Sequence, residues 1–369
     1  RGRTSRASRN PLSCLGERGF LPRVNARTPL QLALSALAVG RTLAVEEVAA
    51  AFAEVMRGAA TPAQVGALLL GLRVRGETAE EIAGAAQALR AAMVPVAADA
   101  PDLIDTCGTG GGAVSTFNIS TAAALVAAGA GATVAKHGNR SFTSACGSAD
   151  VAEALGIRIL HDAAGAARVL RACRITFLFA PQFHPAVKHV APVRRELGVP
   201  TLMNLAGPLA NPARVSRQVV GVADADRAPL AAEALRRLGA VHALVVHGRA
   251  GLDEISTHGP TDAWEGRADA VSHWTIDPAI YRLAVGDLEA LRGGQPGENA
   301  ARIEALLAGG NGDEAGAAAT LLNAGAAIYV AGLATSYAEG IGRARHVLGS
   351  GAARLVLERW RRASVSTSG

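Results

Sequence analysis

A glycine-rich loop that follows a short apolar run constrains the folding of this 369-residue chain most strongly. Residues 105–121 read DTCGTGGGAVSTFNIST, and PDLIDT at 101–106 leads into them. When a strand leads into such a loop and the loop leads into a helix, the loop presents free backbone N–H groups and the helix start presents the positive end of its dipole. Glycine permits close approach to this backbone, so the stretch predicts either a phosphate-binding loop or a tight structural turn. It matches neither GxxxxGK[ST] nor GxGxxG, the P-loop and Rossmann fingerprints.

The segments before and after this loop differ in their apolar pattern. From about residue 28 to 94, apolar positions recur every three or four residues, which predicts helices without a strand. Later, short apolar runs alternate with helical patterns. We predict strands at 132–136, 175–181, 217–222 and 241–248, and helices from about 120, at 147–156, 163–173 and 226–238. Strands alternating with helices indicate a parallel, helix-covered sheet.

The predicted fold class is therefore α/β, with a small all-helical domain and a larger α/β domain that contains a mainly parallel central sheet. The helical domain would span residues 28–96. A helical segment at 184–198 is expected to return to it, so that about 185–212 belong to the same domain. The α/β domain would then comprise residues 97–184 and 213–369.

The formal net charge of +6 comes from one end of the chain. Residues 1–27 hold seven arginines against one acid, and the remaining 342 residues carry 30 basic and 30 acidic side chains. We expect 1–27 to be a disordered leader, because it lacks an initiating Met and a clear amphipathic face. A neutral remainder argues against nucleic-acid binding, which depends on clustered cations. The most apolar stretch, 122–135, is too short to span a membrane, so a soluble cytoplasmic protein is expected.

Lysine is rare in this sequence, and its position is informative. Arginine accounts for 35 of the 37 basic residues, and the two lysines are Lys136 and Lys188. Lys136 ends a predicted strand, and the carboxyl ends of parallel strands line the ligand crevice in such folds. A compact ammonium there suits a phosphate oxygen. A lysine retained by chance during a drift toward arginine would explain the same observation.

Two adjacent acids, Asp253 and Glu254, follow the predicted strand at 241–248. Carboxylates near a phosphate site suit Mg²⁺, which prefers a few carboxylates together with substrate phosphates. An Asp-Glu pair is also common in solvated turns, and the residues alone favour that ordinary interpretation. The four cysteines form no CxxC pair and no zinc-type spacing with histidines, which indicates reduced thiols.

Eight ordered motifs resemble the anthranilate phosphoribosyltransferase family. They are GTGG at 108–111, STFNIST at 115–121, VAKHGNR at 134–140, GSADVAEALG at 147–156, FAPQFHPAVK at 179–188, PVRRELG at 192–198, NLAGPLANPA at 204–213 and VVHGRAGLDEIS at 245–256. The resemblance covers essentially residues 28–362. It implies Mg²⁺-dependent transfer of phosphoribosyl from phosphoribosyl pyrophosphate to the amine of anthranilate, in tryptophan biosynthesis. It also implies a homodimer formed through the helical domain, and it leaves association with anthranilate synthase open.

The resemblance also implies the site residues. Phosphoribosyl pyrophosphate would be bound by Gly108, Gly111, Gly112, Thr116, Asn118, Ser120, Thr121, Lys136, Ser144 and Ser148. Anthranilate would meet Gly108, His137, Asn139, His184 and Arg194, whose guanidinium fork pairs a carboxylate. Mg²⁺ would be held by Ser120, Asp253 and Glu254. Lys136 would stabilise the leaving pyrophosphate, and His137 would either accept a proton or order its loop.

The chain departs from the family pattern in the glycine loop. The family commonly reads GTGGDG where this chain reads GTGGGA, so Gly112 replaces an aspartate that contacts the phosphoribosyl substrate. Our hypothesis is that Asp253 and Glu254 still organise the metal, with weaker substrate binding. Two alternatives stay open: a pyrimidine nucleoside phosphorylase of the same fold, and a homologue that binds nucleic acid without transferase activity. Asn139 and Arg194 favour the transferase over both.

Overall fold

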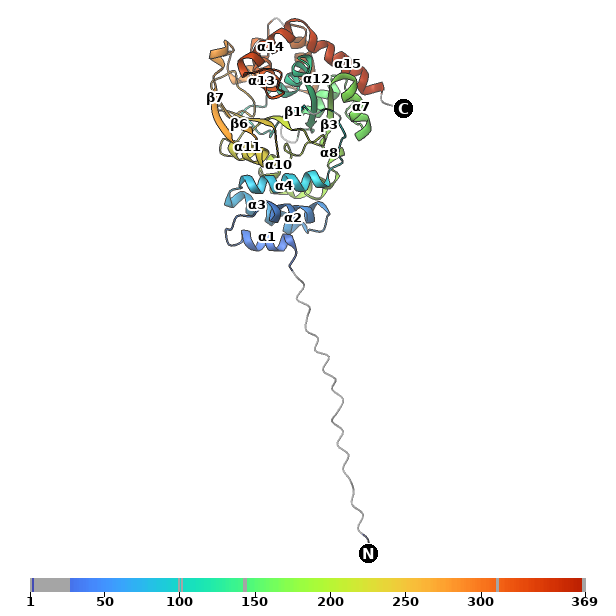
Figure 1. Ribbon diagram of the computed structural model, residues 1–369, viewed down its shortest axis with the longest axis vertical. Coiled ribbons are helices and arrows are strands. Elements are labelled where there is room, and N and C mark those ends of the chain that lie inside the picture. Colours follow the sequence, from blue (N-terminus) through green and yellow to red (C-terminus); the bar gives the residue numbers. More distant parts are fainter. Residues whose placement is uncertain are drawn as a thin grey trace.

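The computed structural model describes residue 2 and residues 27–366, apart from 99, 101, 142–144, 310 and 311. The predicted leader therefore lies outside the described residues, except for residues 2 and 27. Figure 1 shows a group of helices at one end of the molecule, in blue, and a larger part with a central sheet above it. The predicted fold class is confirmed.

Four helices, coloured blue to cyan in Figure 1, form this helical end: α1 (Pro29–Leu37), α2 (Val45–Met56), α3 (Pro62–Arg75) and α4 (Ala79–Ala92). Three of them begin at a threonine whose side chain accepts a hydrogen bond from the third helical residue. In each case the third residue, Gln or Glu, reaches back to the threonine backbone, which completes a capping box. These local signals explain why the sequence alone locates three of the helices, whereas α2 begins after Ala44 without a side-chain cap and is located by its apolar periodicity.

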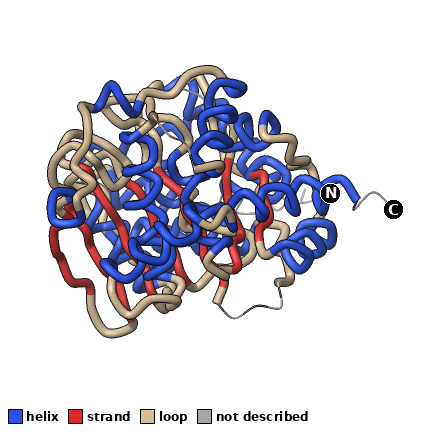
Figure 2. Tube along the Cα trace, turned by 90° about the horizontal axis from the view of Figure 1, so that it is seen from above, coloured by secondary structure: helices blue, strands red, loops and turns tan. Residues whose placement is uncertain are grey.

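The central sheet has seven strands in the order β3-β2-β1-β4-β5-β6-β7. They are β1 (Leu103–Gly108), β2 (Thr133–Gly138), β3 (Ile175–Phe179), β4 (Arg217–Gly221), β5 (His242–Gly248), β6 (Thr261–Arg267) and β7 (Val271–Ile276). The first five are parallel and the last two are antiparallel. Figure 2 shows the strands, in red, among the helices that cover them. The sequence did not predict β6 and β7.

The remaining helices surround this sheet. They are α5 (Ile119–Gly129), α6 (Ser148–Ala154), α7 (Ala163–Cys173), α8 (Ala180–Phe183), η1 (Pro185–His189), α9 (Ala191–Leu197), α10 (Leu202–Ala206), α11 (Ala228–Arg237), η2 (Pro278–Tyr281), η3 (Leu288–Leu291), α12 (Pro296–Leu307), α13 (Glu314–Val330), α14 (Tyr337–Gly349) and α15 (Ala352–Ser366). Two predictions need correction. Strand β3 ends at Phe179 because α8 begins at Ala180, with Pro181 in its first turn, and 184–198 is a 3₁₀ turn followed by α9 rather than one helix.

Both faces of the sheet are buried, as expected for parallel strands. Val219 and Leu244 belong to the apolar cluster formed with α5, α13 and α15. Their neighbours Val220 and Val245 belong to a second cluster, which includes α10, α11 and the helices α1–α4. Val193 of α9 lies in this second cluster, and α9 contacts α3. One continuous apolar core therefore joins the helical end to the sheet.

The strand order reverses between β1 and β4. Strand β2, which follows β1 in the chain, lies on one side of it, and β4 lies on the other. In open α/β sheets, ligands bind outside the carboxyl ends of the strands at such a switch point. The carboxyl ends of β1 and β4 therefore mark the position of the candidate site.

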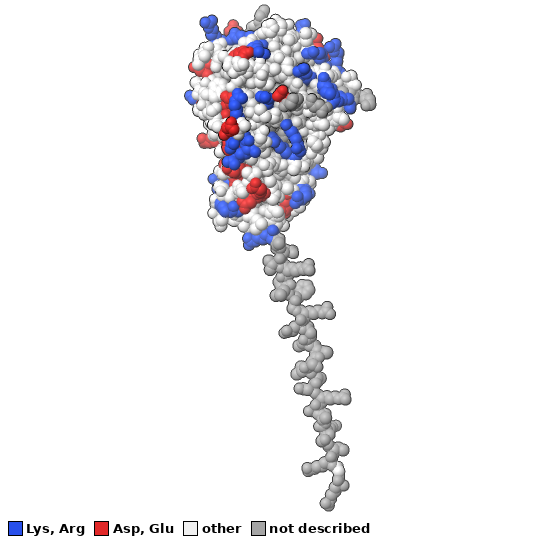
Figure 3. All heavy atoms as spheres, in the orientation of Figure 1, with Lys and Arg blue, Asp and Glu red and all other residues white. Residues whose placement is uncertain are grey.

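Basic and acidic side chains are interspersed on the face shown in Figure 3. This agrees with the balance of charges over residues 28–369. Among the described residues, no helix is both long enough and apolar enough to cross a bilayer.

Candidate active site

Two paired glycines form the floor of the site. Gly108 at the end of β1 is in register with Gly221 at the end of β4. A Cβ on Gly108 would lie 2.6 Å from Oδ2 of Asp253, and a Cβ on Gly221 would overlap the Asp253 carbonyl group. The loop that carries Asp253 therefore rests directly on both strand ends, and side chains at these two positions would displace it.

The glycine loop turns above this floor. Gly110 and Gly111 have φ angles of 69° and 80°, the left-handed region that favours glycine. The N–H of Gly110 donates to Oδ2 of Asp253 at 2.7 Å. The N–H groups of Gly111 and Gly112 have no acceptor among the described residues. The turn and the ligand-binding interpretations of this loop are thus compatible: the loop is a tight turn that leaves two donors available.

The sequence predicts free backbone N–H groups at the start of α5, but in the structure these groups already have acceptors. The N–H of Ser120 donates to Oε1 of Glu254 at 3.2 Å, and that of Thr121 donates to the Asn118 carbonyl at 3.0 Å. A carboxylate at a helix N-terminus is stabilised by the helix dipole. Glu254 therefore occupies the position that the sequence assigns to a phosphate group, so the glycine loop rather than α5 offers the free donors.

Asp253 and Glu254 are both partly buried, which separates them from an ordinary solvated turn. Burial raises the pKa of Asp253, and burial together with the adjacent Asp253 carboxylate raises the pKa of Glu254 to about 8. No group of three or more His, Cys, Asp or Glu side chains within the described part of the chain is arranged to hold a metal. Glu254 contacts the Ser120 N–H, and Asp253 contacts the glycine loop through the Gly110 N–H. Carboxylate and hydroxyl oxygens of this kind suit Mg²⁺ when phosphate oxygens complete the donor set.

Lys136 lies beneath Ser120 and is almost fully buried, with 1% of its surface exposed. Its Nζ donates to the Thr106 carbonyl at 2.6 Å and to the Ser120 Oγ at 3.2 Å. Burial lowers the pKa of Lys136, and the nearby Asp105 carboxylate opposes that effect. A buried lysine that contacts a predicted metal ligand and lies on a strand end is not explained by compositional drift alone.

Sequence reasoning missed Asp105, which supports this lysine. Asp105 is fully buried in β1, and burial raises its pKa to about 6. Its Oδ1 accepts the His137 N–H at 3.1 Å and its Oδ2 accepts from Asn211 Nδ2 at 2.8 Å. An acid within the apolar run LIDT was the available signal, because buried charges are retained only with partners.

His137 and His184 lie side by side, with ring centroids 5.1 Å apart. The Nε2 atoms of both are buried and have no hydrogen-bond partner among the described residues. Burial lowers the pKa of His137 well below its usual value and lowers that of His184 to about 4. Both rings are therefore neutral near pH 7. The lowered pKa disfavours the protonated form of His137, and both roles predicted for this residue stay predictions.

Asn139 and Arg194, two of the residues expected to meet anthranilate, lie on different elements. Asn139 follows β2, and its carbonyl accepts hydrogen bonds from Ala149 N and from Ser148 Oγ. Arg194 lies on α9, where Nη2 donates to Oδ1 of Asn204 at 3.2 Å. Arg194 forms no ion pair with any described acid, and burial lowers its pKa. A partly buried cation without a counter-ion among the described acids favours an anionic ligand.

The other predicted ligands have mixed surroundings. Thr116 forms an isolated bridge with Arg292, and the Asn118 side chain is bonded to Asn299 and Cys146. Thr121 is fully buried, and its hydroxyl has no partner among the described residues. Ser144 lies outside the described residues.

Comparison with known proteins agrees with the two-part architecture. Residues 31–93 match the helical bundle domain of the glycosyl transferase family, and residues 100–354 match the a/b domain of that family.

Curated and solved relatives cover most of the chain. The anthranilate phosphoribosyltransferase of Roseiflexus castenholzii is 52% identical over 329 residues, covering 87% of this chain and 94% of the relative. The crystal structure of anthranilate phosphoribosyltransferase from Thermus thermophilus has a TM-score of 0.85 at 42% identity and covers 90% of this chain and 99% of that one. The Saccharomyces cerevisiae enzyme in complex with PRPP and Mg has a TM-score of 0.83 at 28% identity, covering 91% and 98%. The chain therefore belongs to the anthranilate phosphoribosyltransferase family.

Proposed function

We propose that the chain transfers phosphoribosyl from phosphoribosyl pyrophosphate to the amine of anthranilate in the crevice above Gly108 and Gly221. The products are N-(5-phosphoribosyl)anthranilate and pyrophosphate, in tryptophan biosynthesis. The observation that carries this proposal is the convergence of three features at one sheet edge. The glycine loop offers free donors, Lys136 supplies a buried cation, and Asp253 and Glu254 supply paired carboxylates.

Stabilisation of the leaving group is the main catalytic contribution in this proposal. As the bond from the sugar to pyrophosphate breaks, negative charge accumulates on the pyrophosphate and cationic character on the ribose. Preorganised donors in a site shielded from water stabilise such charge strongly. The Gly111 and Gly112 N–H groups and the Lys136 ammonium fulfil this role. An aromatic amine needs no prior deprotonation, so positioning of the acceptor supplies most of the remaining effect.

Mg²⁺ fits the donor set of Ser120, Asp253 and Glu254. Adjacent partly buried carboxylates carry unfavourable like charge, which a divalent cation offsets. Bound Mg²⁺ would neutralise developing charge on the pyrophosphate oxygens. The Ser120 N–H holds Glu254, so the carboxylate is already oriented toward the site.

Anthranilate would bind on the side of α9. The Arg194 guanidinium pairs its carboxylate, and Asn139 with the neutral His137 and His184 rings lines the opposite wall. Neutral rings stack on an aromatic acceptor without adding a competing charge. Arg194 has no acidic partner among the described residues, and this supports an acceptor that carries a carboxylate over a nucleoside.

The test of this function is the loss of anthranilate fluorescence by purified protein with phosphoribosyl pyrophosphate, with and without Mg²⁺. Magnesium-dependent loss is expected. Cleavage of thymidine in phosphate buffer without anthranilate turnover would instead support a nucleoside phosphorylase, and salt-dependent DNA binding by residues 28–369 without turnover would support the nucleic-acid-binding alternative.

Replacing Gly112 with aspartate is expected to lower the apparent KM for phosphoribosyl pyrophosphate. Gly112 lacks the positive φ of Gly110 and Gly111. A Cβ there would lie 3.1 Å from the Gly251 carbonyl oxygen and 3.3 Å from Asp253 Oδ1, so a side chain fits after a shift of a few tenths of an ångström, and bound Mg²⁺ would offset the like charge beside Asp253. A charged acceptor for a substrate hydroxyl lowers KM by about tenfold. Initial rates at saturating Mg²⁺ measure this. Gly112→Asn, which has the same size but no charge, is the control, and an unchanged or higher KM in Gly112→Asp would contradict the hypothesis.

We also propose a cytoplasmic homodimer formed through the helical end. Leu32 on α1 and Leu70 and Val74 on α3 are exposed apolar side chains, and these two helices contact each other. Exposed apolar patches of this kind commonly mark interfaces. Sedimentation that gives the mass of a single chain across a wide concentration range would contradict the dimer.

A further inference from the structure

Arg194 is held by a neutral acceptor. Its Nη2 donates to the side-chain Oδ1 of Asn204, the third residue of α10. The same Oδ1 also accepts the backbone N–H of Thr201 at 3.0 Å. Because one oxygen receives both donors, the position of the Arg194 guanidinium depends on the start of α10.

A second contact fixes the start of α10 from the other side. The carbonyl of Thr201 accepts a hydrogen bond from Arg227 Nη2 at 3.0 Å. Arg227 precedes α11 and its side chain is 7% exposed. Thr201 itself is fully buried, so this link lies inside the molecule.

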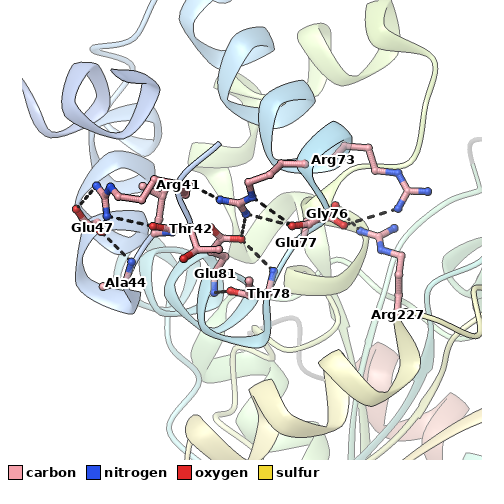
Figure 4. A network of polar contacts seen from close by, with 12 residues as sticks. Arg41, Thr42, Ala44, Glu47, Arg73, Gly76, Glu77, Thr78, Glu81 and Arg227 are labelled. Carbon is pink, nitrogen blue, oxygen red and sulfur yellow. Dashed lines mark hydrogen bonds and ion pairs between the residues drawn. The ribbon is translucent and has the colours of Figure 1, made fainter. Parts of the chain in front are cut away.

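Arg227 is in turn paired with Glu77, which lies between α3 and α4. Arg227 Nη2 and Glu77 Oε1 are 2.9 Å apart, and the Glu77 side chain is 2% exposed. Figure 4 shows Glu77 between Arg73 and Arg227, which reach it from α3 and from the start of α11. This ion pair therefore connects the helical end to the segment that carries Asn204.

We propose that Asn204 is a positioning residue that orients Arg194 toward the acceptor carboxylate, and that the buried Glu77–Arg227 ion pair holds Asn204 in place. This inference rests on the proposed binding of anthranilate by Arg194. Neither Asn204 nor the ion pair touches the acceptor, so both act through Arg194.

Asn204 is uncharged, and this determines how strongly Arg194 can bind an anionic ligand. An amide carbonyl fixes one arm of the guanidinium but leaves its positive charge uncompensated for an incoming carboxylate. An aspartate in the same position would form a charge-assisted pair with Arg194 and compete with the ligand. The two residues have nearly the same shape, so Asn204→Asp changes the charge while it keeps an oxygen acceptor for Thr201 N–H.

The test is the steady-state kinetics of full-length Asn204→Asp with each substrate varied in turn. The KM for anthranilate is expected to rise by about tenfold or more, because a charged competitor replaces a neutral one. The KM for phosphoribosyl pyrophosphate and the kcat at saturating anthranilate are expected to stay within about twofold. A purely structural role would instead change both KM values and kcat together.

Glu77→Gln tests the contribution of the Glu77–Arg227 ion pair to the position of Asn204. It leaves Arg227 buried without a counter-ion, and a smaller, about threefold, rise in KM for anthranilate is expected. Glu233→Gln is the control for the loss of a carboxylate that pairs with arginine, because Glu233 pairs with Arg236 and Arg237 on α11, whereas the Thr201 carbonyl is held by Arg227. Its KM for anthranilate is expected to match that of the unaltered chain.

The outcomes separate this inference from the proposed function. Absence of anthranilate turnover by the unaltered chain would overturn the function itself, and an unchanged KM for anthranilate in Arg194→Gln would overturn the role of Arg194. If both behave as proposed and Asn204→Asp still binds anthranilate as tightly as the unaltered chain, the positioning role of Asn204 is overturned. Equal effects of Glu77→Gln and Glu233→Gln would overturn the role of the ion pair.

Discussion

Replacing Lys136 with methionine is expected to lower kcat by about 10²–10³-fold, the usual effect of removing one preorganised donor from a site of developing negative charge. The ammonium lies under Ser120, to whose hydroxyl it donates at 3.2 Å. Methionine preserves most of the apolar stem but removes the charge and the hydrogen bonds to the Thr106 carbonyl and the Ser120 hydroxyl. Because buried Asp105 also loses this cation, the melting temperature of Lys136→Met is measured beside its kcat, and the loss of kcat is expected to persist at temperatures where the variant is folded.

The surroundings of Lys136 explain why arginine cannot replace it. Its Nζ fits between the Thr106 carbonyl and the Ser120 hydroxyl, and it is almost completely buried. A planar guanidinium is larger than an ammonium and needs several acceptors in one plane. Lys136→Arg is expected to lose activity about as severely as Lys136→Met, although it keeps the charge.

Lys188 provides the matched control, since it is the other lysine of the chain and is exposed on η1. Lys188→Met is expected to retain the kcat of the unaltered chain. Single-turnover measurements of anthranilate fluorescence compare the three variants directly. Lys136→Met with a kcat within about threefold of the unaltered chain would contradict the assignment of Lys136 to the leaving group.

The predictable parts of the fold are those with local signals. Threonine caps such as Thr28 and Thr61, followed by proline, define helix starts through contacts within one turn. Lys136 could be located from the sequence because it interrupts an apolar strand next to the glycine loop. The fold class followed from the change between these two patterns and is confirmed.

The features that were missed depend on contacts between distant segments. Strands β6 and β7 read TDAWEGR and VSHWTI, and their edge of the sheet is only partly covered, so they lack a continuous apolar run. Asp105 and Asn204 acquire roles only when β1 and α10 meet residues far away in the chain. The hydrogen bond from Ser120 to Glu254 joins residues 134 positions apart, and no local pattern indicates it.

Gly221 is a further missed residue, and Gly221→Ala is expected to be among the most damaging single methyl additions in the described chain. The added Cβ would overlap the carbonyl carbon and oxygen of Asp253, which are backbone atoms and cannot rotate away. Overpacking of this kind destabilises a protein by about 1–3 kcal/mol or more. The melting temperature is expected to fall by roughly 3–10 °C for a domain of this size.

Activity should fall more steeply than stability in Gly221→Ala. Relief of the overlap requires the segment that carries Asp253 and Glu254 to move away from β4, and both carboxylates move with it. A misplacement of about 1 Å costs roughly 10²-fold in rate. Higher Mg²⁺ should recover little of this loss, since the cation can increase occupancy but cannot return the ligands to their original positions.

Gly342→Ala separates this effect from the general cost of replacing a glycine. Gly342 is exposed within α14, and a Cβ there has nothing within 4 Å, so alanine is expected to stabilise the chain by about 0.5–1 kcal/mol. Its kcat should be unchanged. Calorimetry together with kcat/KM for phosphoribosyl pyrophosphate compares the two variants. If Gly221→Ala melts and turns over like Gly342→Ala, the Asp253 segment does not rest on β4, and the floor of the site needs a different explanation.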